Sequence, residues 1–187
     1  MRVSITLLQY DHGVIRQVLD CLKEILENDF LDEYERVAVD IHDFLSEFMD
    51  RFHHRKEENF IFPSVSNKSD ETARISDSLI RDHEKAREFL ARMKKSISEG
   101  SISDRSSFIE AGKNLVRHVT DHIKEEEERA FPIFEGIISV EEDIDIYTEC
   151  ERFVVDEFDA DFMRRNEDRA FEIENKVLGP GYYEGIA

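Results

Sequence analysis

The sequence predicts an all-α protein: an antiparallel, up-and-down four-helix bundle followed by an additional C-terminal helix. Apolar residues recur every three or four positions in five long segments, which places them on one face of a helix. The 187 residues include only 7 Gly and 3 Pro, so few breaks interrupt these segments. Four amphipathic segments of about 25 residues, joined by short connections, are typical of such a bundle.

The first four segments supply the four helices of the expected bundle. The second and the fourth are expected to end just before the phrases Phe62-Pro63 and Phe131-Pro132, because proline disrupts a helix interior. Gly100 is expected to cap the C-terminal end of the third. We expect the four helices at about residues 5–26, 33–60, 75–97 and 104–130.

A fifth helix is predicted from the capping box that begins at Ser139 to about Lys176. It has an apolar face that must lie against the bundle or against another subunit: Phe153, Val154, Phe158, Phe162 and Phe171. The predicted domains are therefore a bundle at residues 1–138 and a C-terminal helix with its tail at 139–187. Packing of this helix on a partner subunit would make a homodimer.

The composition limits the classes of partner and compartment. The chain has 44 acidic against 25 basic residues, a net charge of −19, which repels phosphate backbones and anionic lipids. We therefore expect neither nucleic acid nor membrane as a partner. No apolar run reaches the ~18 residues of a membrane span, and the N-terminal segment lacks a signal-peptide core. Two isolated cysteines, Cys21 and Cys150, indicate no disulfide framework, so a cytoplasmic protein is expected.

An internal repeat is the most informative feature of the sequence. The phrase D-H-x-x-x-R at residues 11–16 returns at 82–87, 71 positions later. The phrase H-x-[KR]-x-E-E-x-x-x-F-P at residues 53–63 returns at 122–132, 69 positions later. The first two helices therefore correspond to the third and fourth, and the two halves are expected to build matching parts of one site.

The repeat places polar side chains at positions that belong to the core. His12 and His83 occupy the apolar stripes of their helices, and each H-x-x-x-E sets an imidazole and a carboxylate one turn apart on the same face. Buried carboxylates that face each other are costly unless cations neutralise them. Two divalent cations would remove this cost, so six ligands are predicted: His12, His53, Glu57, His83, His122 and Glu126.

The ligand types narrow the identity of the metal. Imidazole and carboxylate without thiolate suit iron or manganese, and they also permit zinc or copper. A closed structural zinc site needs only four ligands, whereas six ligands in two equal sets indicate two ions. Each ion would have three protein ligands, with both Glu side chains free to bridge and with open positions for water, hydroxide, oxygen or nitric oxide.

Other side chains close to these positions are candidates for an extra ligand or a supporting role: His118, His54, Glu58, Arg16 and Arg87. His118 precedes His122 by one turn and could be an additional ligand. His54 is rotated by about 100° from His53, which favours a place behind the ligands or at the surface. Arg16 and Arg87 could pair with the inner carboxylates or form ion pairs at the rim. His42 is expected at the surface.

The phrases D-H-x-x-I-R, H-H-x-K-E-E-x-x-x-F-P and H-I-x-x-E resemble the hemerythrin-like (HHE cation-binding) domain family over about residues 4–137. The resemblance implies a four-helix bundle with two iron ions, bridged by carboxylate and an oxo or hydroxo group, on the same six ligands. Oxygen carriers of this family have a fifth histidine where this chain has Arg87. The four-His, two-Glu set is more similar to the branch that repairs iron centres under nitric-oxide stress.

Three functions are compatible with these observations. The first is a non-haem di-iron module that binds or senses oxygen, nitric oxide or the iron and redox state. The second is an enzyme that reduces peroxide, nitric oxide or oxygen at the same centre, or acts in iron-centre repair. The third is a structural bundle that holds no metal.

Overall fold

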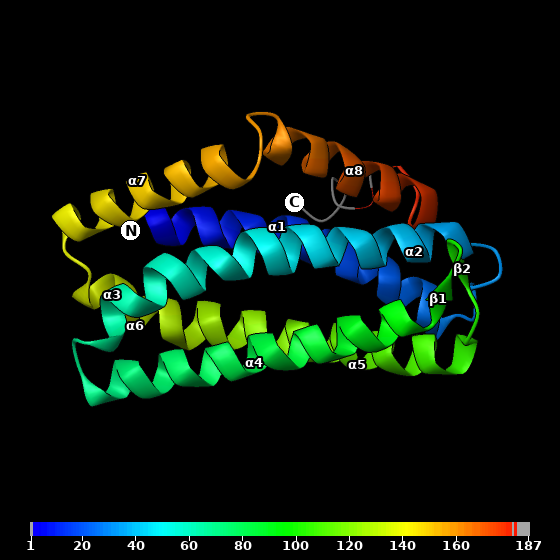
Figure 1. The fold of residues 1–187 in the computed structure, drawn as a ribbon, viewed down its shortest axis with the longest axis horizontal. Coiled ribbons are helices and arrows are strands. Elements are labelled where there is room, and N and C mark those ends of the chain that lie inside the picture. The colour runs from blue at the N-terminus through cyan, green and yellow to red at the C-terminus, as the bar shows by residue number, and fades with distance from the viewer. Residues whose placement is uncertain (1, 181, 183–187) are drawn as a thin grey trace.

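The computed structural model describes residues 2–180 and 182, so most of the predicted C-terminal tail lies outside the described residues. The fold class is confirmed: the chain forms an elongated bundle of antiparallel helices with further helices packed along one side (Figure 1). The first helix is α1 (Val3–Glu27), and α4 (Asp70–Lys95) is the third helix of the bundle. Helix α4 packs against α5 (Arg105–Glu125), which begins the fourth helix of the bundle. Because several of these four long helices consist of more than one element, each is called a run below.

The second and fourth helices of the bundle continue through their prolines, contrary to the sequence-based expectation. The second comprises α2 (Glu35–Phe44), the π-helical η1 (Leu45–His54) and η2 (Glu57–Ile61), and α3 (Phe62–Ser66). The fourth continues from α5 into the π-helical η3 (Glu126–Ala130) and α6 (Phe131–Ile137).

The π turns explain how the helices accommodate proline. The backbone N–H of Phe62 donates to the carbonyl of Glu57, five residues earlier, and that of Phe131 donates to the carbonyl of Glu126. This wider turn relieves the crowding between a proline ring and the preceding turn. Each proline then lies in the first turn of a new α-helix, where its missing N–H would have no helical partner.

The connection between α4 and α5 is a small hairpin rather than a glycine-capped helix end. Helix α4 stops at Lys95, and β1 (Ile97–Ser98) pairs antiparallel with β2 (Ser101–Ile102). Gly100 has a φ of +78° in the turn between the two strands, a conformation that glycine adopts without a steric penalty. The sequence contained no alternating pattern for this ladder because each strand has only two residues.

The predicted fifth helix is two helices, α7 (Val140–Glu157) and α8 (Phe162–Val177). The Ser139 capping box at the start of α7 is confirmed. The chain bends where Phe158 adopts an extended backbone, and the bend allows both helices to lie along α1 (Figure 1). Phe158 and Phe162 pack on Phe52 of η1, whereas Phe171, predicted to face the bundle, is 53 % exposed.

The core consists of two apolar clusters. The large cluster fills the bundle near the hairpin and includes buried side chains of residues 14–26, 44–52, 86–93, 108–123 and 162–173. The small cluster fills the opposite end and contains Ile5, Leu8, Ile61, Phe62, Val65, Ile75, Leu79, Ala130, Phe131, Phe134, Ile138, Ile146 and Cys150. Along each of the four helices of the bundle, the candidate ligands lie near the change from one cluster to the other.

Both cysteines are buried and free, and burial raises the pKa of each thiol to about 12. Among the helices of the described residues, none combines the length and the apolar character needed to cross a bilayer. The predicted boundary between residues 138 and 139 falls in the short connection between α6 and α7; the division into two domains stays a prediction.

Candidate metal centre

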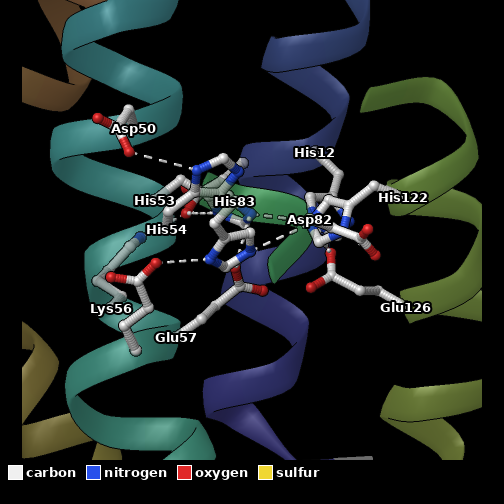
Figure 2. A network of polar contacts seen from close by, with 12 residues as sticks. His12, Asp50, His53, His54, Lys56, Glu57, Asp82, His83, His122 and Glu126 are labelled. Atoms are coloured by element: carbon white, nitrogen blue, oxygen red, sulfur yellow. Dashed lines mark hydrogen bonds and ion pairs between the residues drawn. The ribbon is translucent and has the colours of Figure 1, made fainter. Parts of the chain in front are cut away.

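The six predicted ligands meet in the middle of the bundle (Figure 2). Each is at most 5 % exposed. They come from all four helical runs, because the histidine of each run and the two glutamates occupy the stripes that face the bundle axis. Glu57 and Glu126 are the first residues of π turns, at equivalent places in the two halves.

The imidazoles form two pairs, and each carboxylate lies between the pairs. The Nε2 atoms of His12 and His53 are 3.0 Å apart, and those of His83 and His122 are 3.2 Å apart. Glu126 Oε2 lies 3.2 Å from His12 Nε2 and 3.3 Å from His122 Nε2. Glu57 Oε2 lies 3.5 Å from His53 Nε2 and 3.4 Å from His83 Nε2.

Two groups of four side chains therefore share the same two carboxylates. One group is His12, His53, Glu57 and Glu126, and the other is Glu57, His83, His122 and Glu126. In each group one donor atom per residue lies within 4.8 Å of all the others. This arrangement could hold two cations, one beside each histidine pair.

The chemistry of the two carboxylates fits cations. In the described part of the chain, none of the four carboxylate oxygens of Glu57 and Glu126 has a hydrogen-bond partner, although all are buried. Burial raises the pKa of both carboxyl groups well above the usual range. Native structures rarely leave buried polar atoms unpaired without an unseen ion or water. Two bound cations would supply the missing partners.

The histidines are neutral and point their Nε2 atoms toward the carboxylates. Burial lowers the pKa of His12 to about 4 and lowers the pKa of His53, His83 and His122 from the ordinary value. Neutral imidazole is the form that binds a metal, so these rings need not lose a proton to bind one at neutral pH.

Carboxylates on the opposite side of the rings hold two of the histidines in matching ways. His12 Nδ1 lies 2.9 Å from Glu127 Oε1, and His83 Nδ1 lies 2.8 Å from Glu58 Oε1. Arg16 pairs with Glu127, and Arg87 pairs with Glu58. Such contacts orient metal-binding imidazoles. Both arginines therefore pair with these outer carboxylates and not with Glu57 or Glu126.

The aspartates of the repeated D-H phrase contact the histidines of the neighbouring helices. Asp11 Oδ2 lies 3.1 Å from His53 Nδ1 and also pairs with buried Lys56. Asp82 Oδ2 lies 3.8 Å from His122 Nδ1 and is partly exposed. Sequence reasoning recognised the repeated aspartates but gave them no role, and it missed Lys56. The available signal for the two aspartates was their repeated place directly before His12 and His83.

His118 and His42 lie outside both groups of four. His118 is half-buried, and its Nε2 lies 2.8 Å from the carbonyl oxygen of Asp82. His42, expected at the surface, is only 3 % exposed. Its Nε2 lies 3.2 Å from the carbonyl oxygen of Leu90 because α4 packs over this face of α2.

His54 is also buried, with an exposure of 1 %. Of the two places expected for it, behind the ligands or at the surface, the surface is therefore wrong. Its ring stacks on that of His83 with centroids 3.8 Å apart, and burial lowers its pKa to about 4. A ring nitrogen of His54 lies within 4.8 Å of donor atoms of His83 and His122.

The fold and the site define a helical-bundle protein with a buried histidine and carboxylate centre suited to cations. Residues 3–134 match the family model of the hemerythrin HHE cation binding domain, and the chain belongs to this family. Comparison with curated proteins gave no match, and comparison with solved structures gave none.

Proposed function

We propose that this protein is a non-haem di-iron protein that binds or senses a small diatomic molecule, oxygen or nitric oxide, or the iron and redox state. The observation that carries the proposal is the pair of carboxylates, Glu57 and Glu126, that two histidine pairs share and whose buried oxygens have no hydrogen-bond partner among the described residues. One ion would lie beside His12 and His53, and the other beside His83 and His122.

The donor set supports iron. Four imidazoles and two carboxylates, without thiolate, are ligands that iron accepts, and manganese or zinc could occupy the same positions. Iron so held supplies redox chemistry and open coordination positions for a small ligand. Both carboxylates could bridge the ions, together with an oxo or hydroxo group. The histidine-orienting contacts of Glu127 and Glu58 would keep the imidazoles aligned for this role.

A cavity beside the centre supports a small, uncharged ligand. Its volume is about 180 Å³, and apolar side chains of α1, α7 and α8 form much of its wall, among them Leu8, Val154 and Met163. Its lining also includes Asp11, the carboxylate that contacts His53. Apolar diatomic molecules partition favourably into apolar cavities, so this cavity would bring them close to the His12–His53 pair.

Metal analysis of protein purified without added metal tests the proposal. We expect two iron ions per chain and absorption in the near ultraviolet and visible from the bridged ferric pair. Oxygen or nitric oxide added to the reduced protein should change this spectrum. Turnover of peroxide or nitric oxide with a reductant would instead favour the enzymatic alternative. Protein from iron-replete cells that contains no metal would refute the proposal.

Substitution of a candidate ligand provides the matched comparison. His53→Ala should reduce the iron content to one ion per chain or fewer. It should also lose the thermal stabilisation from metal, because a ligand present at 100 times its Kd stabilises a folded protein by ~2.7 kcal/mol. His118→Gln, which changes a histidine outside both groups of four, should retain two ions. Equal iron content in the two variants would contradict the ligand assignment.

A further inference from the structure

We propose that the cavity beside the centre binds a small aromatic alcohol, a phenol, whose hydroxyl group lies on the buried Asp11–Lys56 ion pair. The inference goes beyond the proposed function, because a phenol is larger than a diatomic molecule and its binding needs no iron. The ligand would lie one side chain away from the centre, since Asp11 Oδ2 also contacts His53 Nδ1 at 3.1 Å.

The cavity lies between the bundle and the two C-terminal helices. Side chains of α1 and of the second run form one side of it, and Cys150, Val154 and Met163 of α7 and α8 contribute to the other. The match to the family model ends at residue 134, before α7 begins. The walls that α7 and α8 supply are therefore an addition of this chain to the matched bundle.

The internal repeat shows what this addition changes. Asp11 and Lys56 are 3 % and 6 % exposed. Their counterparts in the second half, Asp82 and Glu125, have side chains that are 37 % and 45 % exposed. The difference follows from the packing of α7 and α8 along α1 (Figure 1). The C-terminal helices thus turn a solvated pair of positions into the inner end of a cavity.

The ion pair at this inner end has unused hydrogen-bonding capacity. Lys56 Nζ donates to Asp11 Oδ2 and lies 3.9 Å from the centre of the Phe52 ring. An ammonium group has three N–H donors, and within the described ranges no acceptor meets the third. Nor does any donor among those residues hydrogen-bond Asp11 Oδ1. One hydroxyl group can accept from the ammonium and donate to the carboxylate.

The mouth of the cavity offers no comparable place for a hydroxyl group. Leu7 and Tyr10 line the mouth and are 36 % and 55 % exposed. The Tyr10 hydroxyl already donates to Glu167 of α8. A ligand with one polar end would therefore enter with that end first and leave its apolar body against the cavity walls.

The size and the walls of the cavity favour an aromatic body. The volume is about 180 Å³, and an apolar cavity of about 150 Å³ binds benzene. A water molecule could satisfy the ion pair, but it would leave the apolar walls without contacts. The Phe52 ring and the Met163 thioether both line the cavity, and both make favourable contacts with aromatic rings.

The functional consequence rests on the proposed function. A phenol in the cavity would occupy the space beside His53 through which oxygen or nitric oxide would approach the centre. A phenolic compound would thus regulate access of the diatomic ligand.

Isothermal titration calorimetry of the purified protein with phenol, benzene and cyclohexanol tests the inference. We expect phenol to bind about 10-fold or more tightly than benzene, because benzene makes no hydrogen bond to the charged pair. Cyclohexanol, which has the hydroxyl group but no aromatic ring, should bind more weakly than phenol. Lys56→Met should remove the preference for phenol over benzene.

Variants that fill the cavity locate the site. Val154→Phe fills it from α7 and should abolish phenol binding, and Met163→Phe fills it from α8 in case the first variant does not fold. The matched control is Val155→Phe, which changes the adjacent side chain, 71 % exposed. This control should bind phenol as the wild type does.

Equal affinities of the wild type for phenol and benzene would overturn the inference, and so would cyclohexanol binding as tight as that of phenol. Phenol binding that both filling variants retain would also overturn it, since the ligand would then lie elsewhere. These measurements do not depend on iron. A protein that takes up no iron would refute the proposed function and leave the phenol site standing.

Discussion

Glu57 and Glu126 are two carboxyl groups that burial makes costly to ionise. Each is completely buried, burial raises the pKa of both carboxyl groups, and the neighbouring Glu57 raises the pKa of Glu126 further. A protein that folded only for stability would place leucine at such positions, since a buried ionisable group weakens a core unless it is compensated. These residues therefore make the metal-free protein sensitive to pH.

We predict that Glu57→Gln stabilises the metal-free protein at alkaline pH. The folded-state pKa of Glu57 is raised, so its stabilising contribution is complete below the unfolded value of 4.5 and is lost as pH rises through the folded value. Glutamine has the same shape and no charge. Thermal melts of apo-protein should agree at pH 4 and diverge as pH rises, and at pH 8 the variant should melt about 3 °C or more higher.

Added iron should reverse this order, because the variant lacks one bridging carboxylate. Glu125→Gln, which changes an exposed glutamate next to Glu126 at the end of α5, should follow the wild-type melting curve at every pH. Melting temperatures of wild type and Glu57→Gln that differ by a constant amount from pH 5 to pH 8 would show that Glu57 stays ionised in the folded apo-protein.

At the scale of the elements, α7 does more than cover one side of the bundle. Helix α1 begins after Arg2 without a side-chain cap of its own. Asp143 of α7 accepts hydrogen bonds from the backbone N–H groups of Val3 and Ser4, at 2.8 and 3.0 Å, and from the Ser4 hydroxyl at 2.6 Å. A side chain that is distant in sequence thus satisfies the free N–H groups of α1.

Asp143→Ala should therefore destabilise the protein by ~1–2 kcal/mol, the typical cost of losing an N-terminal cap. For a chain of this length, thermal unfolding should shift down by about 2–8 °C. Amide exchange should accelerate at the start of α1 and along α7. Asp145→Ala, which changes an exposed aspartate two residues further along α7, is the control, and an equal shift in both variants would contradict the capping role.

At the scale of the whole molecule, the polar centre lies between the large and the small apolar clusters. His12 follows Leu8 of the small cluster and precedes Ile15 of the large one along α1. The order is the same along α4 and is reversed along the antiparallel second and fourth helices of the bundle, so one polar layer crosses the entire bundle. Cations bound in this layer would link the two clusters.

Removal of metal by a chelator should loosen the two ends of the bundle unequally. The small cluster buries fewer side chains than the large cluster, so it depends more on the link through the centre. Hydrogen exchange should accelerate in residues 57–66 and 126–137 and change little in residues 14–26. Helical content should persist, and equal acceleration in all three segments would contradict this prediction.

The periodicity of the sequence determined the helices and the inward positions of the six candidate ligands. Helical register follows from local spacing, so the repeat alone placed His53 and Glu57 one turn apart on the inner face. The same reasoning stopped two helices at Pro63 and Pro132, because it treated proline as a breaker and did not anticipate π turns before it.

Only the tertiary structure decided which side chains meet across helices. The sequence contained Asp11, Asp50 and Lys56, but it could not show which side chains they meet. Asp11 contacts His53 and Lys56 of another helix, and Asp50 pairs with Arg87 of α4. Burial of His42 and exposure of Phe171 likewise depend on which helix packs over each. Spacing within one helix sets the direction of a side chain, whereas its environment is set by neighbours that the chain brings together only on folding.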